Sequence, residues 1–281
     1  MKKDRQSPTD STAHRPQKRF GQNFLTNQSI INRIIASLDP KPGETIIEIG
    51  PGEGALTHPL LEHESRVVAV EFDNHLIPPL EQRFGGGENF HLVHADALTT
   101  DFCEIISPAT TARVVANLPY NVSTAILQRL IEQRACVTEM VLMLQREVVD
   151  RITAAPGSSE RGYLSVLVEA YCETEKLFDV APGSFRPAPK VWSSVVRVTP
   201  RVESKAKVKD EKLLWRVVGA GFAQRRKTIL NNLRHSPPPL QEALKDHGGA
   251  SIVLCRAEVE LQRRAETLTL EEWARIARAM E

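Results

Sequence analysis

Short runs of β-branched and aliphatic residues alternate with segments of helical spacing over most of the chain. Residues 27–38 show the helical spacing first, with apolar residues on one face. The apolar runs predict strands at residues 45–50, 66–72, 90–96, 112–118, 140–145, 175–180 and 194–200. The first five alternate with helical segments, which is typical of parallel strands joined by crossover helices. With the two late strands, the pattern predicts an α/β fold with a seven-stranded Rossmann-like sheet.

The alternating pattern ends near Pro200. Residues 201–212 are polar and charged, and the spacing beyond them is helical only, over residues 210–233, 239–248 and 269–280. Thr269 and Glu272 form a capping-box pair at the start of the last helix. The sequence therefore predicts one domain over residues 20–200 and a small C-terminal all-α domain over residues 201–281.

The charge is nearly balanced overall but uneven along the chain. Lys and Arg number 36 against 35 for Asp and Glu, yet residues 1–19 hold six basic residues against two acidic ones. Residues 201–235 hold ten against three. These segments are either solvated surfaces or the binding sites of a polyanion. We expect residues 1–19 to form a basic, mobile tail.

Cysteine usage and the apolar runs indicate the compartment. The cysteines are widely scattered, with no C-x-x-C pair: Cys103, Cys136, Cys172 and Cys255. This spacing argues against a metal site or a disulfide framework and predicts a reducing, cytoplasmic environment. No apolar run has the length of a signal peptide core or of a membrane span, so we expect no membrane association.

A glycine-rich turn follows the first predicted strand in "EIGPGEGALT", with Gly50, Gly52 and Gly54. Glycine lets the backbone turn sharply and lets a ligand approach it. The spacing G-x-G-x-G differs from the G-x-G-x-x-G of dinucleotide sites, and Pro51 removes an N–H group from the loop. The turn therefore suits a ligand without phosphate better than a pyrophosphate, unless its role is only structural.

Hydrogen-bond acceptors follow the next three predicted strands. Glu71 ends the second strand, where a carboxylate can accept hydrogen bonds from ribose hydroxyls, and Asp96 ends the third, where it can accept one from an adenine amino group. Asn117 ends the fourth. Because these strand ends share one edge of the sheet, the sequence predicts a site for a nucleoside without phosphate. S-adenosylmethionine fits that description.

The fourth loop reads "NLPYNVST". The side-chain oxygen of Asn117 and the backbone carbonyl of Leu118 could hold the two hydrogens of an adenine amino group. The nitrogen lone pair would then point at a sulfonium methyl group. Tyr120 offers a ring on which a base can stack, worth roughly 1–3 kcal/mol. The alternative is a buried turn with a satisfied asparagine and a tyrosine in the core.

Together these segments resemble the KsgA/RsmA family of ribosomal RNA adenine dimethyltransferases. The resemblance also covers "RFGQNFL" (19–25), "LQREVVDRI" (144–152), "FRPAPKVWSS" (185–194) and "QRRKTILNNL" (224–233). It implies an S-adenosylmethionine-dependent methyltransferase domain followed by a small helical domain. It also implies that the chain dimethylates N6 of two adjacent adenosines in a hairpin near the 3′ end of 16S rRNA, with a role in small-subunit maturation. We further expect a monomer without a metal ion.

The resemblance also implies roles for individual residues. Asn23 and Leu25 would line the methionine end of the cofactor, while Gly50, Glu71, Asp96 and Asn117 would hold the rest. Phe185 would stack on the target base opposite Tyr120, unless it only anchors its loop in the core.

The basic run Arg225, Arg226 and Lys227 falls on a predicted long helix. Three consecutive residues cannot all face the apolar side of that helix. They would therefore bind RNA or form salt bridges to the first domain.

Three other functions remain open from the sequence. A resistance-type adenine methyltransferase acting on large-subunit rRNA would share the catalytic loop, although "QRRKTILNNL" argues against it. A nicotinamide-dependent oxidoreductase is disfavoured by Pro51 and the glycine spacing. A ribosome-assembly factor could use the same fold without needing catalysis.

Overall fold

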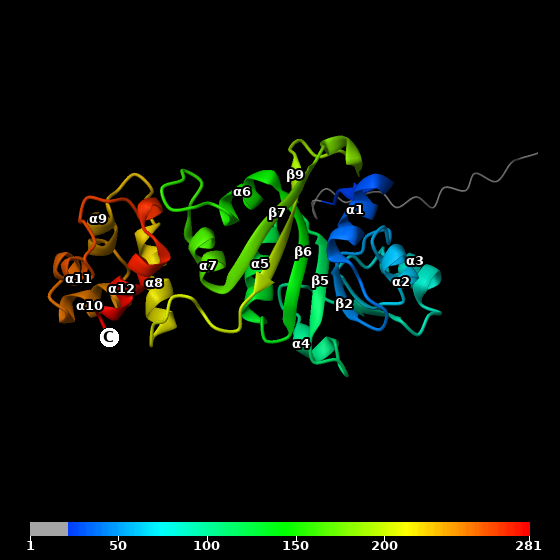
Figure 1. Cartoon of the computed structure of the whole chain (residues 1–281), viewed down its shortest axis with the longest axis horizontal. Helices are drawn as coiled ribbons and strands as arrows, with labels where there is room; N and C mark the ends of the chain where they lie inside the picture. The colour runs from blue at the N-terminus through cyan, green and yellow to red at the C-terminus, as the bar shows by residue number, and fades with distance from the viewer. Residues whose placement is uncertain (1–21) are drawn as a thin grey trace, which may run out of the picture.

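The computed structural model describes residues 22–281 (Figure 1). The predicted basic tail, residues 1–19, lies outside the described residues. Within residues 22–281, none of the helices combines the length and the apolar content needed to cross a membrane.

The centre of the molecule is a seven-stranded sheet in the order β4-β3-β2-β5-β6-β9-β7. The strands are β2 (Thr45–Ile49), β3 (Arg66–Glu71), β4 (Phe90–His94), β5 (Ala112–Asn117), β6 (Val137–Gln145), β7 (Cys172–Val180) and β9 (Ser193–Pro200). All seven predicted strands are confirmed. The first five pair in parallel, whereas β9 runs antiparallel to both β6 and β7 because it returns beside β7 without a crossover helix.

Helices cover both faces of the sheet because its central strands are apolar on both sides. One face packs against α1 (Gln28–Leu38), α2 (Thr57–Glu62) and α3 (Ile77–Phe84). The other packs against α4 (Phe102–Ile105), α5 (Ser123–Glu132), α6 (Arg146–Ile152) and α7 (Tyr163–Tyr171). Successive residues of β5 point to opposite faces of the sheet. Val115 belongs to the core on the side of α1, α2 and α3, and Val114 to the core on the other side.

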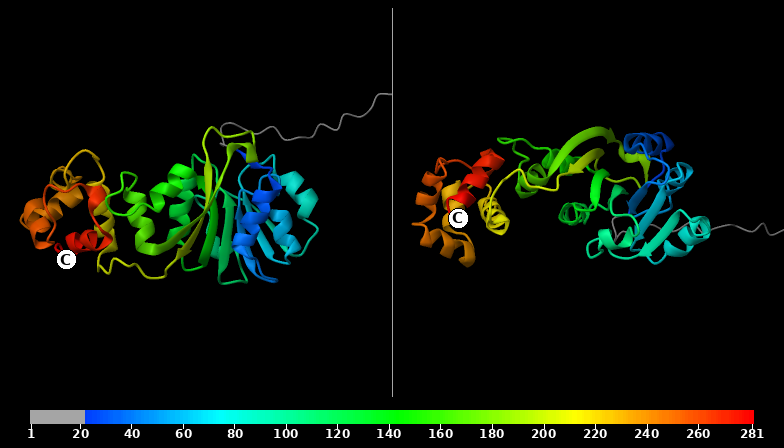
Figure 2. Two further views of the ribbon diagram at one scale, coloured as in Figure 1. Left: turned by 45° about the horizontal axis from the view of Figure 1, so that its top comes forward. Right: turned by 60° about the horizontal axis from the view of Figure 1, so that its bottom comes forward.

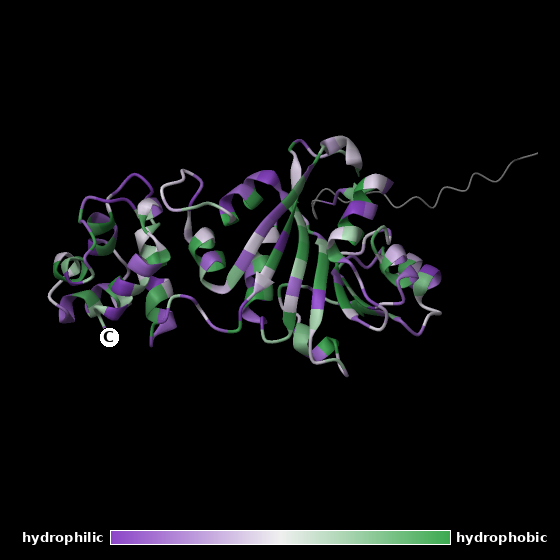
Figure 3. Ribbon diagram, viewed as in Figure 1, coloured by the Kyte–Doolittle hydropathy of each residue, from purple (hydrophilic) through white to green (hydrophobic). Residues whose placement is uncertain are grey.

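The C-terminal residues form a separate group of helices at one end of the molecule (Figures 1 and 2). They are α8 (Glu211–Gly221), α9 (Ile229–Arg234), α10 (Pro238–Asp246), α11 (Ala250–Arg256) and α12 (Leu270–Arg278). Apolar and polar residues alternate along these helices, as Figure 3 shows. The capping box of Thr269 and Glu272 is confirmed. The apolar core continues from α7 into α8 and α12, so a domain boundary at residue 200 stays a prediction.

The predicted long helix over residues 210–233 is wrong. The chain leaves α8 at Gly221 and begins α9 at Ile229. The side chain of Thr228 caps α9 by accepting from Asn231 N. Asn232 donates to the carbonyl oxygens of Gly221 and Gln224 and holds the intervening turn. The chain therefore begins a second, separately capped helix at Ile229 instead of continuing α8.

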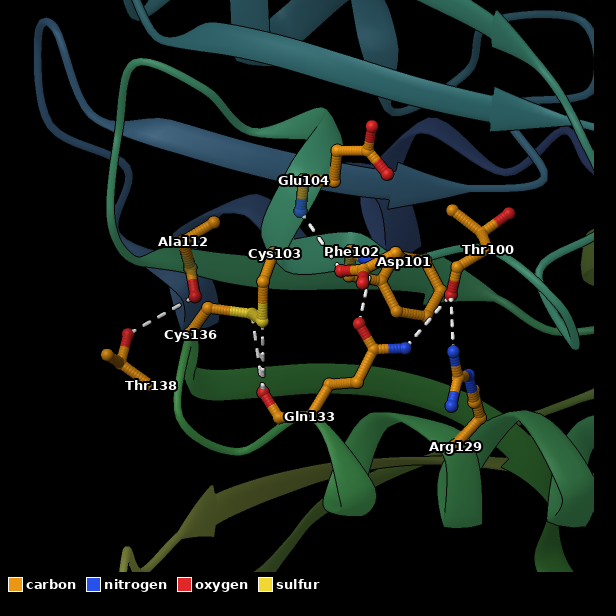
Figure 4. The surroundings of a disulfide bond; sticks show 10 residues. All are labelled: Thr100, Asp101, Phe102, Cys103, Glu104, Ala112, Arg129, Gln133, Cys136 and Thr138. Atoms are coloured by element: carbon orange, nitrogen blue, oxygen red, sulfur yellow. Dashed lines mark hydrogen bonds between the residues drawn. A yellow bond between two sulfur atoms is a disulfide. The ribbon is translucent and has the colours of Figure 1, made fainter.

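The prediction against a disulfide is also wrong, since Cys103 and Cys136 are bonded (Figure 4). The two residues lie 33 positions apart in sequence, and their Cα atoms are 5.5 Å apart. Folding brings them together because β5 and β6 are neighbours and each cysteine precedes one of these strands. The side chain of Gln133 joins the same segments, accepting from Phe102 N at 2.6 Å and donating to Thr100 O at 2.9 Å. Scattered cysteines therefore no longer argue for a reducing compartment.

Candidate active site

A cavity lies at the carboxyl ends of β2, β3, β4 and β5, open to solvent, with an empty volume of about 1020 Å³. Its lining includes the predicted cofactor residues Asn23, Gly50, Glu71, Asp96 and Asn117. The catalytic-loop residues Leu118 and Tyr120 line it as well. The structure therefore brings residues from four strand ends to one site, as the parallel topology requires.

The glycine turn shapes the cavity floor. Gly50 and Gly52 have φ angles of 67° and 60°, which side chains rarely adopt. A Cβ atom at position 52 would lie 3.0 Å from the Phe24 ring, so only glycine fits there without displacement. A Cβ atom at Gly50 would meet no atom within 4 Å, because that residue faces open space. The turn leaves room for a ligand against bare backbone.

Glu71 is a buried acceptor of the site, with 6% of its surface exposed. Oε1 accepts from the backbone N–H groups of Phe72 at 2.9 Å and Asp73 at 2.8 Å. Oε2 accepts only a long bond from Gly52 N, at 3.4 Å. Burial raises the pKa of the Glu71 carboxyl, and the three backbone N–H groups oppose that rise. One oxygen is thus fixed by the backbone, and the other has capacity for ribose hydroxyls.

Asp96 is held in a similar way. Its Oδ1 accepts from Leu98 N at 2.9 Å, which leaves Oδ2 to accept from an amino group in the cavity. Phe72, which sequence reasoning missed, also lines the cavity, and 54% of its surface is exposed. An aromatic ring between the ribose acceptor and the adenine acceptor suits a stacked purine. The available sequence signal was an aromatic residue directly after the strand-ending carboxylate.

Asn117 has its side chain oriented by the chain segment opposite. Nδ2 donates to the backbone carbonyl of Asn23 at 2.9 Å. With the amide so assigned, Oδ1 is the acceptor that a substrate amine can use. Leu118 N donates to Met143 O at 3.2 Å, and no hydrogen bond from the described residues reaches the Leu118 carbonyl oxygen. Two acceptors therefore lie next to each other on one rigid turn.

Tyr120 forms part of the cavity wall. Its hydroxyl and the Ser193 hydroxyl are 2.7 Å apart, which joins the catalytic loop to β9. Burial raises the pKa of the Tyr120 hydroxyl, so the side chain is neutral at physiological pH. Because its hydroxyl is anchored, the ring presents a fixed surface to a base.

A short segment crosses the site and closes one side. Gln22 donates to Asp73 Oδ2 at 2.8 Å, beside the end of β3, while the Asn23 carbonyl accepts from Asn117 at the end of β5. The next two residues form β1 (Phe24–Leu25), which pairs with β8 (Phe185–Arg186). The sequence alone predicted Asn23 only as a turn residue. Its place here depends on two hydrogen bonds across the fold.

A smaller cavity adjoins the main one and is lined by Leu25, Glu48, Gly50 and Asn117, among others. Glu48, which sequence reasoning missed, is 2% exposed and accepts from the Thr57 hydroxyl at 2.6 Å. Burial raises its pKa to about 7. Leu25 and the glycine turn thus line the same smaller cavity, and the role of Leu25 at the methionine end of the cofactor stays a prediction.

Two predicted groups lie away from the cavity lining. Phe185 is 5% exposed and packs in the core with Phe24 and Leu25, so the structure does not bring its ring into the cavity. Residues Arg225–Lys227, hereafter the basic loop, are exposed in the turn between α8 and α9 rather than on a helix. Arg225 donates to the Ser159 carbonyl oxygen, in the loop between α6 and α7. None of the three forms an ion pair with any residue between 22 and 281.

The acceptor set fits S-adenosylmethionine. Glu71 suits the ribose hydroxyls, Asp96 the adenine amino group and Phe72 the adenine ring. Pro51 and the glycine spacing leave no cradle of N–H groups for a phosphate. The smaller cavity beside Leu25 and Asn117 offers space for the methionine end.

Comparison with known proteins agrees with this fit. Residues 13–275 match the family model described as ribosomal RNA adenine dimethylase. The chain is 43% identical over 268 residues to the ribosomal RNA small subunit methyltransferase A of Hahella chejuensis, covering 95% of this chain and 94% of that protein. It is 50% identical over 221 residues to the protein of the same name from Aromatoleum aromaticum, covering 79% and 82%.

Solved structures agree as well. A dimethyladenosine transferase from Plasmodium falciparum superposes with a TM-score of 0.72 at 26% identity, covering 90% of this chain and 95% of that one. The 23S rRNA methyltransferase ErmE superposes with a TM-score of 0.66 at 25% identity, covering 92% and 99%.

The fold and the site define an S-adenosylmethionine-dependent methyltransferase with a Rossmann-like sheet. Within that class, the chain belongs to the ribosomal RNA adenine dimethylase family. The resemblance on which the sequence analysis relied is thereby confirmed, and the nicotinamide-dependent alternative is excluded.

Proposed function

We propose that this enzyme transfers methyl groups from S-adenosylmethionine to N6 of two adjacent adenosines in a hairpin near the 3′ end of 16S rRNA. The observation that carries the proposal is the pair of acceptors at the cavity mouth, Asn117 Oδ1 and the Leu118 carbonyl. The relatives from Hahella and Aromatoleum, named for the small ribosomal subunit, support this choice of substrate.

The substrate amine needs help from the protein because its lone pair is delocalised into the adenine ring. Asn117 Oδ1 and the Leu118 carbonyl each accept one N–H hydrogen, which turns the lone pair out of that conjugation. The Asn23 carbonyl keeps Oδ1 in place through Nδ2. Pro119 keeps the turn rigid and brings no competing N–H group. Positioning and fixed dipoles thus supply the catalysis.

The cofactor supplies an electrophilic methyl group on a sulfonium sulfur. When the cofactor is bound, Glu71 would hold its ribose, and Asp96 and Phe72 would hold its adenine. Tyr120 stacks on the target base from the cavity wall. No general base is required, because the methylated ammonium loses its proton to water. After one transfer the amine keeps one N–H, which a single acceptor can hold for the second.

The basic loop is a candidate for binding the phosphate backbone of the RNA. Its side chains are exposed, and Arg225 joins the basic loop to the loop between α6 and α7 through the Ser159 carbonyl oxygen. Phosphate neutralisation by such residues gives salt-dependent, sequence-independent affinity. We further propose that the enzyme acts as a monomer, without a metal ion, in the cytoplasm during small-subunit maturation.

A second candidate function is the methylation of large-subunit rRNA, favoured by the structural likeness to ErmE. The experiment that separates the two offers labelled S-adenosylmethionine and the full chain to under-methylated small and large subunits in parallel. The proposal expects label in the small subunit only. Label in large-subunit RNA would favour the second candidate. Cofactor binding without transfer to either would favour an assembly factor.

A further inference from the structure

Trp192 is an exposed aromatic residue next to the active site with no role in the mechanism above. It directly precedes β9, and 49% of its surface is exposed. The other two tryptophans both pack against other residues of the protein. Trp273 is fully buried, and Trp215 packs against the rings of Tyr163 and Tyr171. Single exposed apolar residues are common on protein surfaces, so the position of Trp192 and the charge around it decide its role.

The position of Trp192 is fixed by its neighbours. Its carbonyl oxygen accepts from Arg146 N at 2.9 Å, at the start of α6. The next residue, Ser193, contacts the hydroxyl of Tyr120 at 2.7 Å. Consecutive Cα atoms are about 3.8 Å apart, so the backbone of Trp192 lies directly beside the residue that anchors Tyr120.

The segment before Trp192 is positively charged. Arg186 and Lys190 are both exposed, and residues 186–192 contain no acidic residue. Neither cation has an ion-pair partner in the part of the chain that the structure describes. Two carboxylates on α6 and β7, Asp150 and Asp179, pair with Lys176 and Arg146.

Two prolines, Pro187 and Pro189, restrict the backbone of this segment. The charged side chains and the exposed ring are thus presented on a stiff loop. A cationic, preorganised loop with one exposed aromatic ring matches the chemistry of single-stranded nucleic acid, which offers phosphates and base faces together.

We propose that Trp192 stacks on an unpaired base flanking the target adenosine, while Arg186 and Lys190 contact the phosphates on either side. The proposal rests on the proposed function, because it takes the RNA that enters the site as the partner. It adds a second stacking surface outside the cavity. This surface would keep the hairpin loop open while the target base occupies the cavity.

The first test compares steady-state kinetics on under-methylated small subunits for the wild type, Trp192→Ala and Trp192→Phe. We expect Trp192→Ala to raise KM for the subunit about tenfold, the loss of one base–aromatic stack, with kcat nearly unchanged. Trp192→Phe should recover most of the affinity. Ile252→Ala is the matched control, since Ile252 is 46% exposed but lies on α11. An unchanged KM for Trp192→Ala, or a loss confined to kcat, overturns the proposal.

The second test uses naked hairpin RNA with two adjacent adenosines in its loop. Stacking should quench the tryptophan emission of the wild type more than that of Trp192→Phe, because Trp273 is buried and Trp215 packs against Tyr163 and Tyr171. Trp192→Ala should bind about tenfold more weakly with an unaltered salt slope. Arg186→Ala with Lys190→Ala should instead flatten that slope by about 1.4, at about 0.7 for each single-strand phosphate.

The two proposals fail in different ways. If the wild type methylates small subunits and Trp192→Ala does so with the same KM, only the stacking proposal fails. If the wild type transfers no methyl group to small subunits, the proposed function fails. The binding of hairpin RNA by the Trp192 variants then tests the stacking proposal by itself. A Trp192→Ala defect on intact subunits but not on naked RNA would mean that a ribosomal protein is the partner, which also contradicts the proposal.

Discussion

Replacing Glu71 with glutamine should weaken cofactor binding while leaving the fold intact. The carboxylate accepts two short backbone bonds through Oε1, from Phe72 N and Asp73 N. Glutamine keeps an oxygen for these bonds and nearly the same shape. Alanine would instead leave these N–H groups without an acceptor, so the amide variant isolates the role in binding.

The magnitude follows from the charge of the acceptor. Hydrogen bonds to a charged group are worth about 1.5–3 kcal/mol, so the dissociation constant for S-adenosylmethionine should rise about 10- to 150-fold. Stability should behave differently. Burial raises the Glu71 pKa, so the folded carboxyl binds its proton more tightly than the unfolded one. That contribution to stability is lost as pH rises through the folded pKa, and the uncharged variant escapes the loss.

Isothermal calorimetry with S-adenosylmethionine, paired with a thermal melt, measures both effects. Glu81→Gln on the exposed surface of α3 is the matched control and should bind like the wild type. We expect Glu71→Gln to bind weakly and to melt near or above the wild type at pH 8. Unchanged affinity for the cofactor would remove Glu71 from the site and refute the reasoning from strand ends.

Three further predictions follow. Asn117→Ala should lower kcat for methyl transfer about 10²- to 10³-fold, the loss typical of one transition-state hydrogen bond, while single-turnover assays and calorimetry show most cofactor affinity retained. Equal losses in kcat and in cofactor affinity would count against a role for Asn117 in the transition state. Replacing all three residues of the basic loop with alanine should flatten the salt slope of RNA binding by about 2–3 at unchanged cofactor affinity. A lower melting temperature with an unaltered salt slope would show that the basic loop only joins the C-terminal helices to the loop between α6 and α7. The raised pKa of Glu48, about 7, implies that its contribution to the free energy of unfolding is full below about pH 4.5 and lost as pH rises through about 7. Denaturant titrations should show this decline of about 3 kcal/mol in the wild type and not in Glu48→Gln. The same dependence of unfolding free energy on pH in both proteins would exclude this contribution of Glu48.

The sequence predicts the sheet well because strand signals are local. Runs of β-branched residues bounded by turns identified all seven strands, and the strand ends then located Glu71, Asp96 and Asn117 through topology alone. The antiparallel direction of β9 was beyond that pattern, since periodicity is the same in either direction.

The errors share one physical cause, which is dependence on contacts between distant residues. Apolar spacing continues through residues 210–233, yet Asn232 bonds to Gly221 and turns the chain there. The disulfide joins two cysteines that only the pairing of β5 with β6 brings together. Phe185, for which the sequence left both base stacking and a loop anchor open, is buried where β8 pairs with β1. Sequence patterns contain none of these contacts.

The most direct test of the account identifies the methylated nucleoside itself. Under-methylated small subunits would be incubated with labelled S-adenosylmethionine and the full chain, and the 16S rRNA then digested to nucleosides and separately mapped. We predict label in N6,N6-dimethyladenosine at two adjacent adenosines of a hairpin near the 3′ end, formed about 10²- to 10³-fold more slowly with Asn117→Ala. Label on another base, on another atom of adenine, or undiminished label with Asn117→Ala would contradict the account.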